Sequence, residues 1–326
     1  MNLNDMFTVT SLTESINKLP VEPHLLESMG LFSEKGVTTT SVLLEERNGR
    51  LSLVPTASRN DEPAPLKHPK RVRRTLEVPH LPQSGQLLPS ALQNIAPFGR
   101  ETVQNQQARV INDELTRLKS NLNATKEWHR VGALRGKVLD HDGSVLYDLY
   151  EEFDVTKKTL PIPFDVADTK VITHCLNAKR HVESKLQGVM ASGYRALCGP
   201  DFYDALTTHP NVEKAFANWQ AAQDRLAGDN RAGFSYGGID FKEYNVDVSG
   251  HKFIPDNVAS LFPLSKGIFR TYNAPANYNQ TVNTVGKPYY AKAERRKFDK
   301  GWDLESQANP LTLCFLPETL VELVII

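Results

Sequence analysis

The sequence has 326 residues, 38 basic and 38 acidic side chains, and 40% hydrophobic residues. These values are typical of a globular chain of roughly two domains, and they exclude a wholly disordered or fibrous protein. A net charge of zero argues against a global field that would hold the whole chain on nucleic acid or on an anionic membrane. No apolar run approaches the length of about 20 residues that a membrane helix needs, so we expect no insertion into a membrane. The first residues lack a secretion-signal pattern, so we expect no secretion.

The first part of the chain offers few core-forming segments. Residues 1–35 mix polar residues with isolated apolar ones, which predicts an N-terminal arm. Between residues 37 and 54, β-branched and aliphatic residues flank Asn48-Gly49, the strongest short-range signal for a two-residue hairpin turn. Seven prolines lie between residues 55 and 89. Because helices and central strands do not tolerate proline, this stretch is expected to be extended and to lean on another surface.

A change of period marks a long helix between residues 101 and 136. Apolar residues there fall mostly three and four positions apart, as they do on one face of an amphipathic helix. Thr102 is placed to cap its start, and Gly132 and Gly136 stand where such a helix would end. Asp142-Gly143 then predicts a tight hairpin over residues 137–154.

Residues 156–270 alternate helix-like and strand-like segments, which indicates a separate mixed α/β domain. Helices are expected at residues 168–189 and 212–226, and strands at residues 194–198 and from residue 239. The closing stretch places Leu311, Leu313 and Phe315 on one face, so the C terminus is expected to belong to a sheet.

The most enzyme-like string is Gly233-Phe234-Ser235-Tyr236-Gly237, a GxSxG match with Asp247 and His251 downstream in hydrolase order. A nucleophile elbow needs a strand before the serine and a helix after it. Here polar residues precede the string and a strand pattern follows it. A glycine-rich turn leading into a strand is the preferred interpretation, and an α/β hydrolase that uses Ser235 is the alternative.

No metal or nucleotide site is indicated by the remaining motifs. His174, Cys175 and His181 could share a helical face, but further ligands at metal-binding spacing are absent. Gly286-Lys287-Pro288 lacks the earlier glycine and the hydroxyl residue of a phosphate loop. We predict no catalytic residue, cofactor or metal. The three cysteines, odd in number and far apart, are expected to be reduced, buried thiols.

Local charge is more informative than these strings. Residues 64–80 have a net charge of +4, and residues 138–154 have a net charge of −6 with no Lys or Arg. Solvated faces explain such runs equally well. The sharper interpretation is that the two patches pair between neighbouring copies, because a basic segment that cannot fold on itself needs an external partner. A nucleic-acid role for the basic run is a weaker alternative, since the run lacks interleaved aromatic residues.

This subunit-interface hypothesis rests on nine residues of the two runs. They are Lys67, Lys70, Arg71, Arg73, Arg74, Asp148, Glu151, Glu152 and Asp154.

Several segments of the second half carry a resemblance to a known family. They are residues 197–206 with 209–212, residues 234–244 (FSYGGIDFKEY), residues 251–257 (HKFIPDN), residues 269–275 with 281–292, and residues 306–321 (SQANPLTLCFLPETLV). These segments resemble stretches of the major capsid proteins of tailed phages, specifically the family of the phage lambda major head protein. The resemblance is good from about residue 165 to the end, and the first half agrees through the order of its elements.

The resemblance implies an α+β chain with the HK97-like capsid fold. Its implied parts are an N-terminal arm (1–35), an extended β-hairpin loop or E-loop (36–90), a peripheral domain with the long spine helix and the hairpin (91–160), a mixed α/β axial domain (161–285) and C-terminal return strands (286–326). It implies a structural protein without catalytic residues, whose hexamers and pentamers close into an icosahedral shell around double-stranded DNA.

The resemblance also implies partners and locations. The partners are other copies of the chain, scaffold, portal and decoration proteins, and enclosed DNA contacted without sequence preference. The locations are the host cytoplasm during assembly and the virion capsid afterwards.

Overall fold

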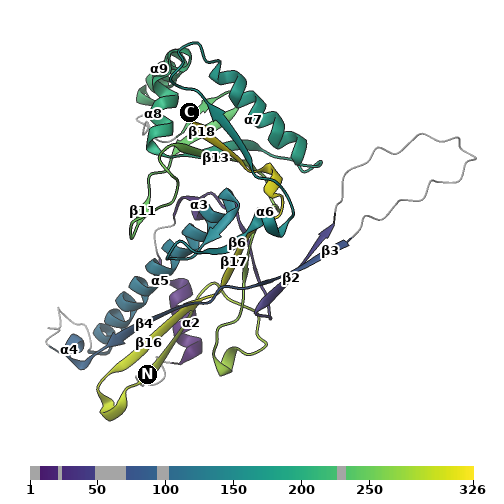
Figure 1. Cartoon of the computed structure of the whole chain (residues 1–326). Coiled ribbons are helices and arrows are strands. Elements are labelled where there is room, and N and C mark those ends of the chain that lie inside the picture. The colour runs from purple at the N-terminus through teal and green to yellow at the C-terminus, as the bar shows by residue number, and fades with distance from the viewer. Residues whose placement is uncertain (1–7, 21–23, 48–70, 94–102, 226–232) are drawn as a thin grey trace, which may run out of the picture. The chain divides into compact units, whose positions relative to one another are not determined.

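The structure is a computed structural model that describes residues 8–20, 24–47, 71–93, 103–225 and 233–326. The chain forms two compact units, both built from segments that are distant in the sequence (Figure 1). Unit 1 combines residues 1–42, 76–130 and 270–313, and unit 2 combines residues 43–75, 131–269 and 314–326. Each unit therefore depends on contacts between the beginning, the middle and the end of the chain.

The described helices are α2 (Val9–Lys18), α3 (Leu25–Ser28), α4 (Pro89–Leu92), α5 (Val103–Arg135), α6 (Leu149–Glu152), α7 (Val171–Lys185), α8 (Pro200–Thr208) and α9 (Pro210–Arg225), with short 3-10 turns at Asn279–Thr281, Lys297–Asp299 and Pro317–Thr319. The strands of the first half are β1 (Ser33–Gly36), β2 (Ser41–Arg47), β3 (Arg71–Glu77), β4 (Leu81–Leu87), β5 (Lys137–Leu139), β6 (Val145–Asp148) and β7 (Lys158–Ile162). Those of the second half are β8 (Gly193–Cys198), β9 (Phe234–Tyr236), β10 (Ile239–Glu243), β11 (Asp247–Val248), β12 (His251–Lys252), β13 (Val258–Leu264), β14 (Phe269–Asn273), β15 (Tyr290–Arg295), β16 (Trp302–Ala308), β17 (Pro310–Cys314) and β18 (Val321–Ile325).

The main core of unit 1 forms between helices α2 and α5 and the antiparallel sheet β15–β16–β4 (Figure 1). Leu115, Leu118 and Leu122 follow one another along one face of α5 at the spacing of an amphipathic helix. They belong to one buried cluster with Leu12 and Ile16 of α2 and with side chains from all three strands. The prediction of a long helix in this region is confirmed.

Two glycines shape the end of α5. Gly136 follows the last helical residue with a φ of +80°, the left-handed conformation that ends many helices. A Cβ atom at this position would lie 2.2 Å from the ring of Tyr150, so a side chain has no room. Gly132, predicted as a possible end, instead lies inside the helix, where a Cβ atom would lie 2.7 Å from the carbonyl oxygen of Lys137. The glycine at position 132 therefore permits close approach of β5 rather than termination.

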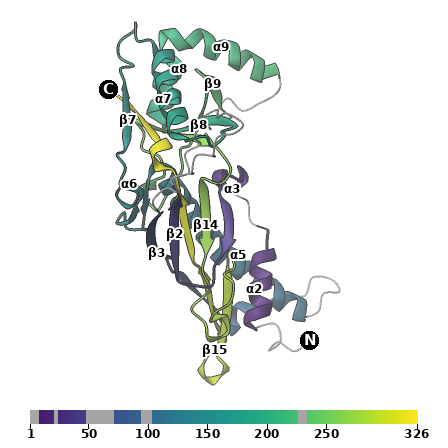
Figure 2. The ribbon, with the colours of Figure 1, turned by 90° about the vertical axis from the view of Figure 1, so that its right-hand side faces the viewer.

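The N-terminal segment contributes more to the core than the sequence predicted. Helix α2 buries Leu12 and Ile16, and its start is capped by the Thr8 side chain, which accepts from the Ser11 backbone N–H. Strand β1 pairs in parallel with β14 in the three-stranded sheet β1–β14–β17 (Figure 2). The prediction of little core-forming material was wrong because two large apolar side chains on a short helix do not stand out in a polar sequence.

Strands β2 and β3 pair with each other in a two-stranded sheet within the stretch predicted as the extended loop. The predicted turn at Asn48-Gly49 lies outside the described residues, as do the prolines at positions 55–69. Pro82 lies in β4, at an edge of its sheet, where the missing N–H of proline is tolerated. This position agrees with the expectation that these prolines are kept out of central strands.

Unit 2 contains a six-stranded mixed sheet in the order β7–β18–β13–β8–β10–β9, together with helices α7, α8 and α9 (Figure 2). Strand β7 pairs in parallel with β18, and β8 pairs in parallel with β10, whereas the other neighbours are antiparallel. The predicted helices and strands of this region are confirmed as α7, α9, β8 and β10. The C-terminal strand β18 joins the sheet, as expected.

The last strands differ from the prediction in one respect. Leu311 and Leu313 are buried, as predicted, but every residue of β17 is buried, including Thr312. The Thr312 hydroxyl meets the Thr271 hydroxyl at 3.2 Å, so the polar group keeps a hydrogen bond inside the protein. The predicted face is confirmed for Leu311 and Leu313, whereas Phe315 follows the end of β17 and is half-buried.

The three cysteines are buried and form no disulfide, as predicted. Burial raises the pKa of Cys175 and of Cys314 to about 12 in both cases. Neither thiol is therefore ionised near neutral pH, which fits packing rather than reactivity.

Candidate functional site

Ser235 of the GxSxG string lies in a β-hairpin. Strands β9 and β10 pair antiparallel through a two-residue turn, Gly237-Gly238, with φ values of +58° and +78°. Two consecutive positive φ values are the pattern of a tight hairpin turn that glycine favours. Because a strand rather than a helix follows Ser235, the string is no nucleophile elbow. The preferred interpretation as a glycine-rich turn is confirmed, and the hydrolase alternative has no support.

Among the described residues, one group of three side chains has metal-ligand chemistry at short range: Asp140, His141 and Asp142 in the turn between β5 and β6. The Asp140 carboxylate accepts a hydrogen bond from the His141 backbone N–H at 2.7 Å, and Asp142 accepts from the Ser144 N–H at 2.9 Å. These carboxylates therefore close the turn itself. His141 and Asp142 are exposed and Asp140 is half-buried, and exposed acidic groups are common in proteins without an ion.

The acidic run places Asp148 at the start of α6. Its carboxylate accepts from the backbone N–H of Tyr150 at 3.0 Å and lies 2.6 Å from the Lys137 ammonium group. Burial alone would raise the pKa of Asp148, but the bond from Lys137 and the backbone N–H groups outweigh burial and lower the pKa. Asp148 therefore acts as a helix cap with an internal counter-ion. Glu151 and Asp154 of the same run are exposed.

The basic run meets the acidic run within one chain at Arg74. Its guanidinium donates to the backbone carbonyl of Glu152 and lies 5.4 Å from the centre of the Phe153 ring, a cation–π distance. Both contacts lie inside unit 2. Strand β3 is thus anchored on α6 of its own chain, through a carbonyl group and a ring rather than through carboxylates.

The other predicted interface residues fall in different places. Arg71 begins β3, Arg73 is exposed on it, and Glu152 is half-buried on α6. Lys67 and Lys70 lie outside the described residues. Within the chain, the structure therefore brings together Arg74 and the backbone of Glu152. Arg73, Glu151 and Asp154 have side chains that are exposed at the surface.

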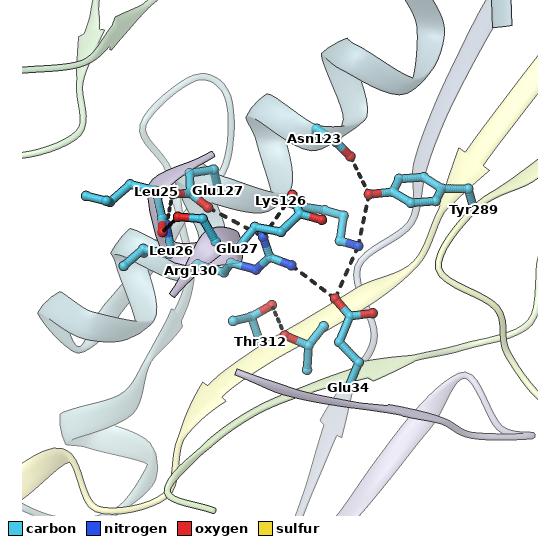
Figure 3. Close-up of polar contacts among 12 residues, drawn as sticks. Leu25, Leu26, Glu27, Glu34, Asn123, Lys126, Glu127, Arg130, Tyr289 and Thr312 are labelled. Carbon is cyan, nitrogen blue, oxygen red and sulfur yellow. Dashed lines mark hydrogen bonds and ion pairs between the residues drawn. The ribbon is translucent and has the colours of Figure 1, made fainter. Parts of the chain in front are cut away.

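The sequence did not predict a buried ionic cluster in unit 1 (Figure 3). Arg130 is its centre: the guanidinium lies 3.0 Å from Glu34, 3.4 Å from Glu127 and 3.7 Å from Glu27. Arg130 and Glu127 come from α5, whereas Glu27 and Glu34 come from α3 and β1. The cluster therefore attaches the N-terminal segment to the long helix.

A second set of contacts extends the cluster to the segment before β15 (Figure 3). The Lys126 ammonium lies 3.5 Å from Glu34 and donates to the Tyr289 hydroxyl at 3.2 Å, and this hydroxyl donates to the side-chain oxygen of Asn123. Lys119 and Lys126 lie 5.0 and 4.5 Å from the centre of the Tyr289 ring. Two cations thus share one aromatic ring, which lowers the cost of burying them.

The charges of the cluster change the acidity of its members. Burial by itself would raise the pKa of Glu34, but Lys126, Arg130 and a hydrogen bond from Asn273 outweigh burial and lower the pKa. Burial lowers the pKa of Lys126, and Glu34 opposes this effect. Burial also raises the pKa of Tyr289, which stays protonated and can donate its hydrogen bond. Removing one partner of such a buried pair is costly, because the charge that remains is buried without compensation.

One sequence signal could have revealed the cluster. Lys126 and Arg130 continue the spacing of Leu115, Leu118 and Leu122 by steps of four, so they extend the buried face of α5. Charged residues on a helix are normally assigned to solvent. Their partners Glu27 and Glu34 lie about a hundred residues earlier in the sequence, where no local pattern connects them to α5.

Helix α2 protects the edge of β15. The Thr13 hydroxyl accepts from the Ala291 N–H at 3.2 Å and lies 3.3 Å from the Ala291 carbonyl oxygen, and Asn17 donates to the Tyr289 carbonyl at 2.8 Å. An edge strand with open N–H and C=O groups would otherwise offer itself to another chain. Two polar side chains of α2 thus replace a neighbouring strand.

No helix in the described parts of the chain combines the length and the apolar character that crossing a bilayer would require. The polar contacts above hold together segments that are distant in the sequence within each of the two units. Comparisons with known proteins agree with this description.

The family model for phage major capsid protein E matches residues 8–325. Among curated proteins, the major capsid protein of Salmonella phage Felix O1 is 25% identical over 97% of this chain and 95% of that protein. The major capsid protein of Pseudomonas phage KPP10 is also 25% identical, over 98% and 97%.

Solved structures show the same fold at low sequence identity. The putative capsid protein of a prophage of E. coli CFT073 superposes with a TM-score of 0.60 at 12% identity, covering 98% of this chain and 99% of that chain. The capsid of Myoviridae phage XM1 superposes with a TM-score of 0.50 at 9% identity, covering 100% and 99%. These likenesses confirm the predicted HK97-like α+β fold over the full length. The chain therefore belongs to the phage major capsid protein E family and is a major capsid protein of tailed phages.

Proposed function

We propose that the chain assembles without catalysis, as hexamers and pentamers, into an icosahedral shell around the double-stranded DNA of a tailed phage. The observation that carries this proposal is the match of the capsid family over residues 8–325. Assembly takes place in the host cytoplasm with scaffold and portal proteins. Decoration proteins bind the finished shell, and DNA is contacted without sequence preference.

The charged runs support one interface between copies. Arg74 anchors β3 on the chain's own α6 through the Glu152 carbonyl and the Phe153 ring, which fixes β3 at one end of the proposed extended loop. The exposed Arg73 and the neighbouring Lys67, Lys70 and Arg71 then meet acidic side chains of an adjacent copy, with Glu151 and Asp154 available at the surface. Such charge pairs steer association and select the register of the partner.

A charge-reversal experiment tests this interface. Arg71→Glu combined with Arg73→Glu should block shell formation while leaving the subunit folded. Arg74 is left unchanged because its side chain packs within the chain. Adding Glu151→Lys and Asp154→Lys to the same chain should restore assembly, because every copy then carries both reversed partners. Normal shells from the first variant, or failure of the rescue, would contradict the charge pairing.

The assembly function itself is tested by negative-stain electron microscopy and sedimentation of the purified chain, alone and co-expressed with the scaffold protein of its phage. Closed shells, tubes or rings of six and five are expected. Ser235→Ala should assemble as the unmodified chain does, since Ser235 lies in a hairpin. A chain that stays monomeric even with its scaffold would contradict the proposal.

A further inference from the structure

The hairpin between β15 and β16 concentrates positive charge in residues 295–300, which we call the hairpin tip. Four of these six residues are basic: Arg295, Arg296, Lys297 and Lys300. Arg295, Lys297 and Lys300 are exposed. The aromatic residues Phe298 and Trp302 stand among and beside these cations. Cations interleaved with aromatic residues are typical of nucleic-acid-binding surfaces, and the basic run of residues 64–80 lacks this combination.

The two arginines of the tip are positioned by their own hairpin. The Arg296 N–H donates to the Gly301 carbonyl at 3.0 Å, and the Arg296 guanidinium lies 3.4 Å from Asp303. Arg295 is opposite Trp302 in the strand pair, and its guanidinium lies 5.4 Å from the centre of the Trp302 ring, a cation–π distance. Both guanidinium groups are therefore held in place before any ligand binds.

Phe298 is the most exposed part of the tip. Its side chain is 90% exposed, and its φ of +62° is a left-handed conformation that a bulky aromatic residue adopts only at a cost. Lys300 lies 5.9 Å from the centre of the Phe298 ring. Neither the exposure nor the strained backbone stabilises the fold. Backbone strain of this kind clusters at binding sites, which indicates that the ring contacts another molecule.

A hollow of about 600 Å³ at the tip has walls with an excess of positive charge. All four cations of the tip line it, together with Phe298, Leu88 and the two carboxylates Glu294 and Asp303. Asp303 already lies beside Arg296, so Glu294 is the carboxylate that most opposes an incoming anion. An excess of two cations over carboxylates in one concave surface attracts negative charge.

We propose that the hairpin tip binds the phosphate backbone of double-stranded DNA. The proposal rests on the function proposed above, in which DNA is contacted without sequence preference, and names the segment that makes the contact. Duplex DNA carries one negative charge per about 1.7 Å of its axis, so several phosphate groups lie within reach of one turn. Guanidinium and ammonium groups bind phosphates without reading the bases. Phe298 packs against the sugars between the phosphates.

The acidic run of a second copy fits the tip less well than DNA does. Asp148 has an internal counter-ion, and Asp140 and Asp142 accept hydrogen bonds within their own turn. The exposed Glu151 and Asp154 are the carboxylates proposed above to meet the extended loop. The described acidic run therefore has few carboxylates left for the tip, whereas DNA supplies phosphates at a regular, close spacing.

A salt titration tests the charge contact. Binding of the purified full chain to a short mixed-sequence duplex is measured by fluorescence anisotropy at several salt concentrations. Lys297→Gln combined with Lys300→Gln should weaken binding about tenfold at low salt and make the plot of log K against log salt shallower by about two, because two phosphate contacts are lost. Lys214→Gln combined with Lys266→Gln is the control, since it removes the same charge from exposed positions of unit 2 and should bind as the unmodified chain does.

The outcomes of this titration separate the alternatives. Equal weakening in both double variants would mean that binding follows the net charge alone, and it would overturn the proposal. So would the absence of duplex binding by the unmodified chain, or normal binding by the tip variant together with failed shell assembly, which would assign the tip to a protein partner. Glu294→Gln should bind more tightly, because it removes the opposing carboxylate. Binding is measured without shells, so failure of the unmodified chain to assemble would contradict the assembly function separately.

Thiol labelling tests the location of the contact. Phe298→Cys keeps all four cations of the tip and places a thiol at its most exposed position, whereas the native cysteines are buried and do not react. The duplex should slow labelling of this thiol by a maleimide, and it should not slow labelling of the exposed control Lys266→Cys. Equal labelling of Phe298→Cys with and without DNA would overturn the proposal. Protection by a single strand but not by the duplex would also overturn it, because the tip would then bind unpaired bases.

Discussion

In unit 2, Phe202, Phe234 and Phe241 are fully buried among aliphatic and aromatic side chains, whereas unit 1 buries Lys126, Glu127 and Arg130 along the second half of α5. The apolar core depends on volume and shape, which related side chains can supply almost equally well. The ionic cluster is sensitive to the loss of a single member, because Lys126, Glu127 and Arg130 are buried and a buried charge that loses its partner is costly. Replacing one buried side chain by methionine should therefore cost much stability in the ionic cluster of unit 1 and little in the apolar core of unit 2.

The largest effect is expected from Arg130→Met. This change removes the cation that lies within 4 Å of Glu27, Glu34 and Glu127. Breaking a buried ion pair in this way costs about 3–5 kcal/mol. Denaturant unfolding of the full chain measures the loss, and hydrogen exchange should locate it in α3, β1 and α5. Arg117→Met on the exposed side of the same helix is the control and should change the stability little.

An intermediate effect is expected from Thr13→Val, which removes the hydroxyl that satisfies the edge of β15. Leaving the buried N–H and C=O groups of Ala291 without partners costs about 1–3 kcal/mol. Thr10→Val, an exposed position on the same helix, gives the baseline. Equal stabilities of the two variants would show that α2 is held by its leucine and isoleucine contacts alone. Sedimentation of the Thr13→Val variant should also show more irregular aggregation, since an open strand edge pairs with other chains.

A smaller effect is expected in the apolar core of unit 2. Leu206→Met keeps nearly the same volume at a fully buried position of α8, and such exchanges usually cost less than about 1.5 kcal/mol. The same denaturant experiment as for Arg130→Met measures it. A loss as large as that of Arg130→Met would contradict the contrast between a tolerant apolar core and an intolerant ionic cluster.

The smallest effect is expected from pH, because the Glu34 side chain is still 32% exposed and its ion pairs are partly screened. Lys126 and Arg130 hold the pKa of Glu34 below its ordinary value of 4.5. A lowered pKa contributes stability that is present above pH 4.5 and is lost as the pH falls through the folded-state pKa. The melting temperature of the chain should therefore fall below pH 4.5, and less steeply in Glu34→Gln. The exposed Glu213→Gln variant should follow the unmodified chain.

Patterns that lie within a short stretch of sequence predicted the corresponding helix and turn. The spacing of Leu115, Leu118 and Leu122 predicts α5. The glycines of the GxSxG string and the strand pattern after it predict a glycine-rich turn, which the structure has at Gly237-Gly238. The motifs of the second half identified the capsid family, because they are continuous stretches of 4 to 16 residues. In the described part of the two charged runs, the sequence showed where the charges are. It did not show that Asp148 pairs with Lys137 or that Arg74 donates to the Glu152 carbonyl.

The tertiary structure alone decided which polar residues face inward. Arg130 and Glu34 are 96 positions apart, and Thr13 and Ala291 are 278 apart. Folding brings the beginning, middle and end of the chain into one unit, and each of these contacts joins two of its three segments. The sequence by itself determined the long helix α5, the helices α7 and α9, the strands β8 and β10 and the family, because these follow from periodicity and continuous motifs. Which charges form the buried ion pairs was decided by their distances in the folded chain. The electrostatic energy of a pair depends on that distance, and the separation of two residues in the sequence does not give it.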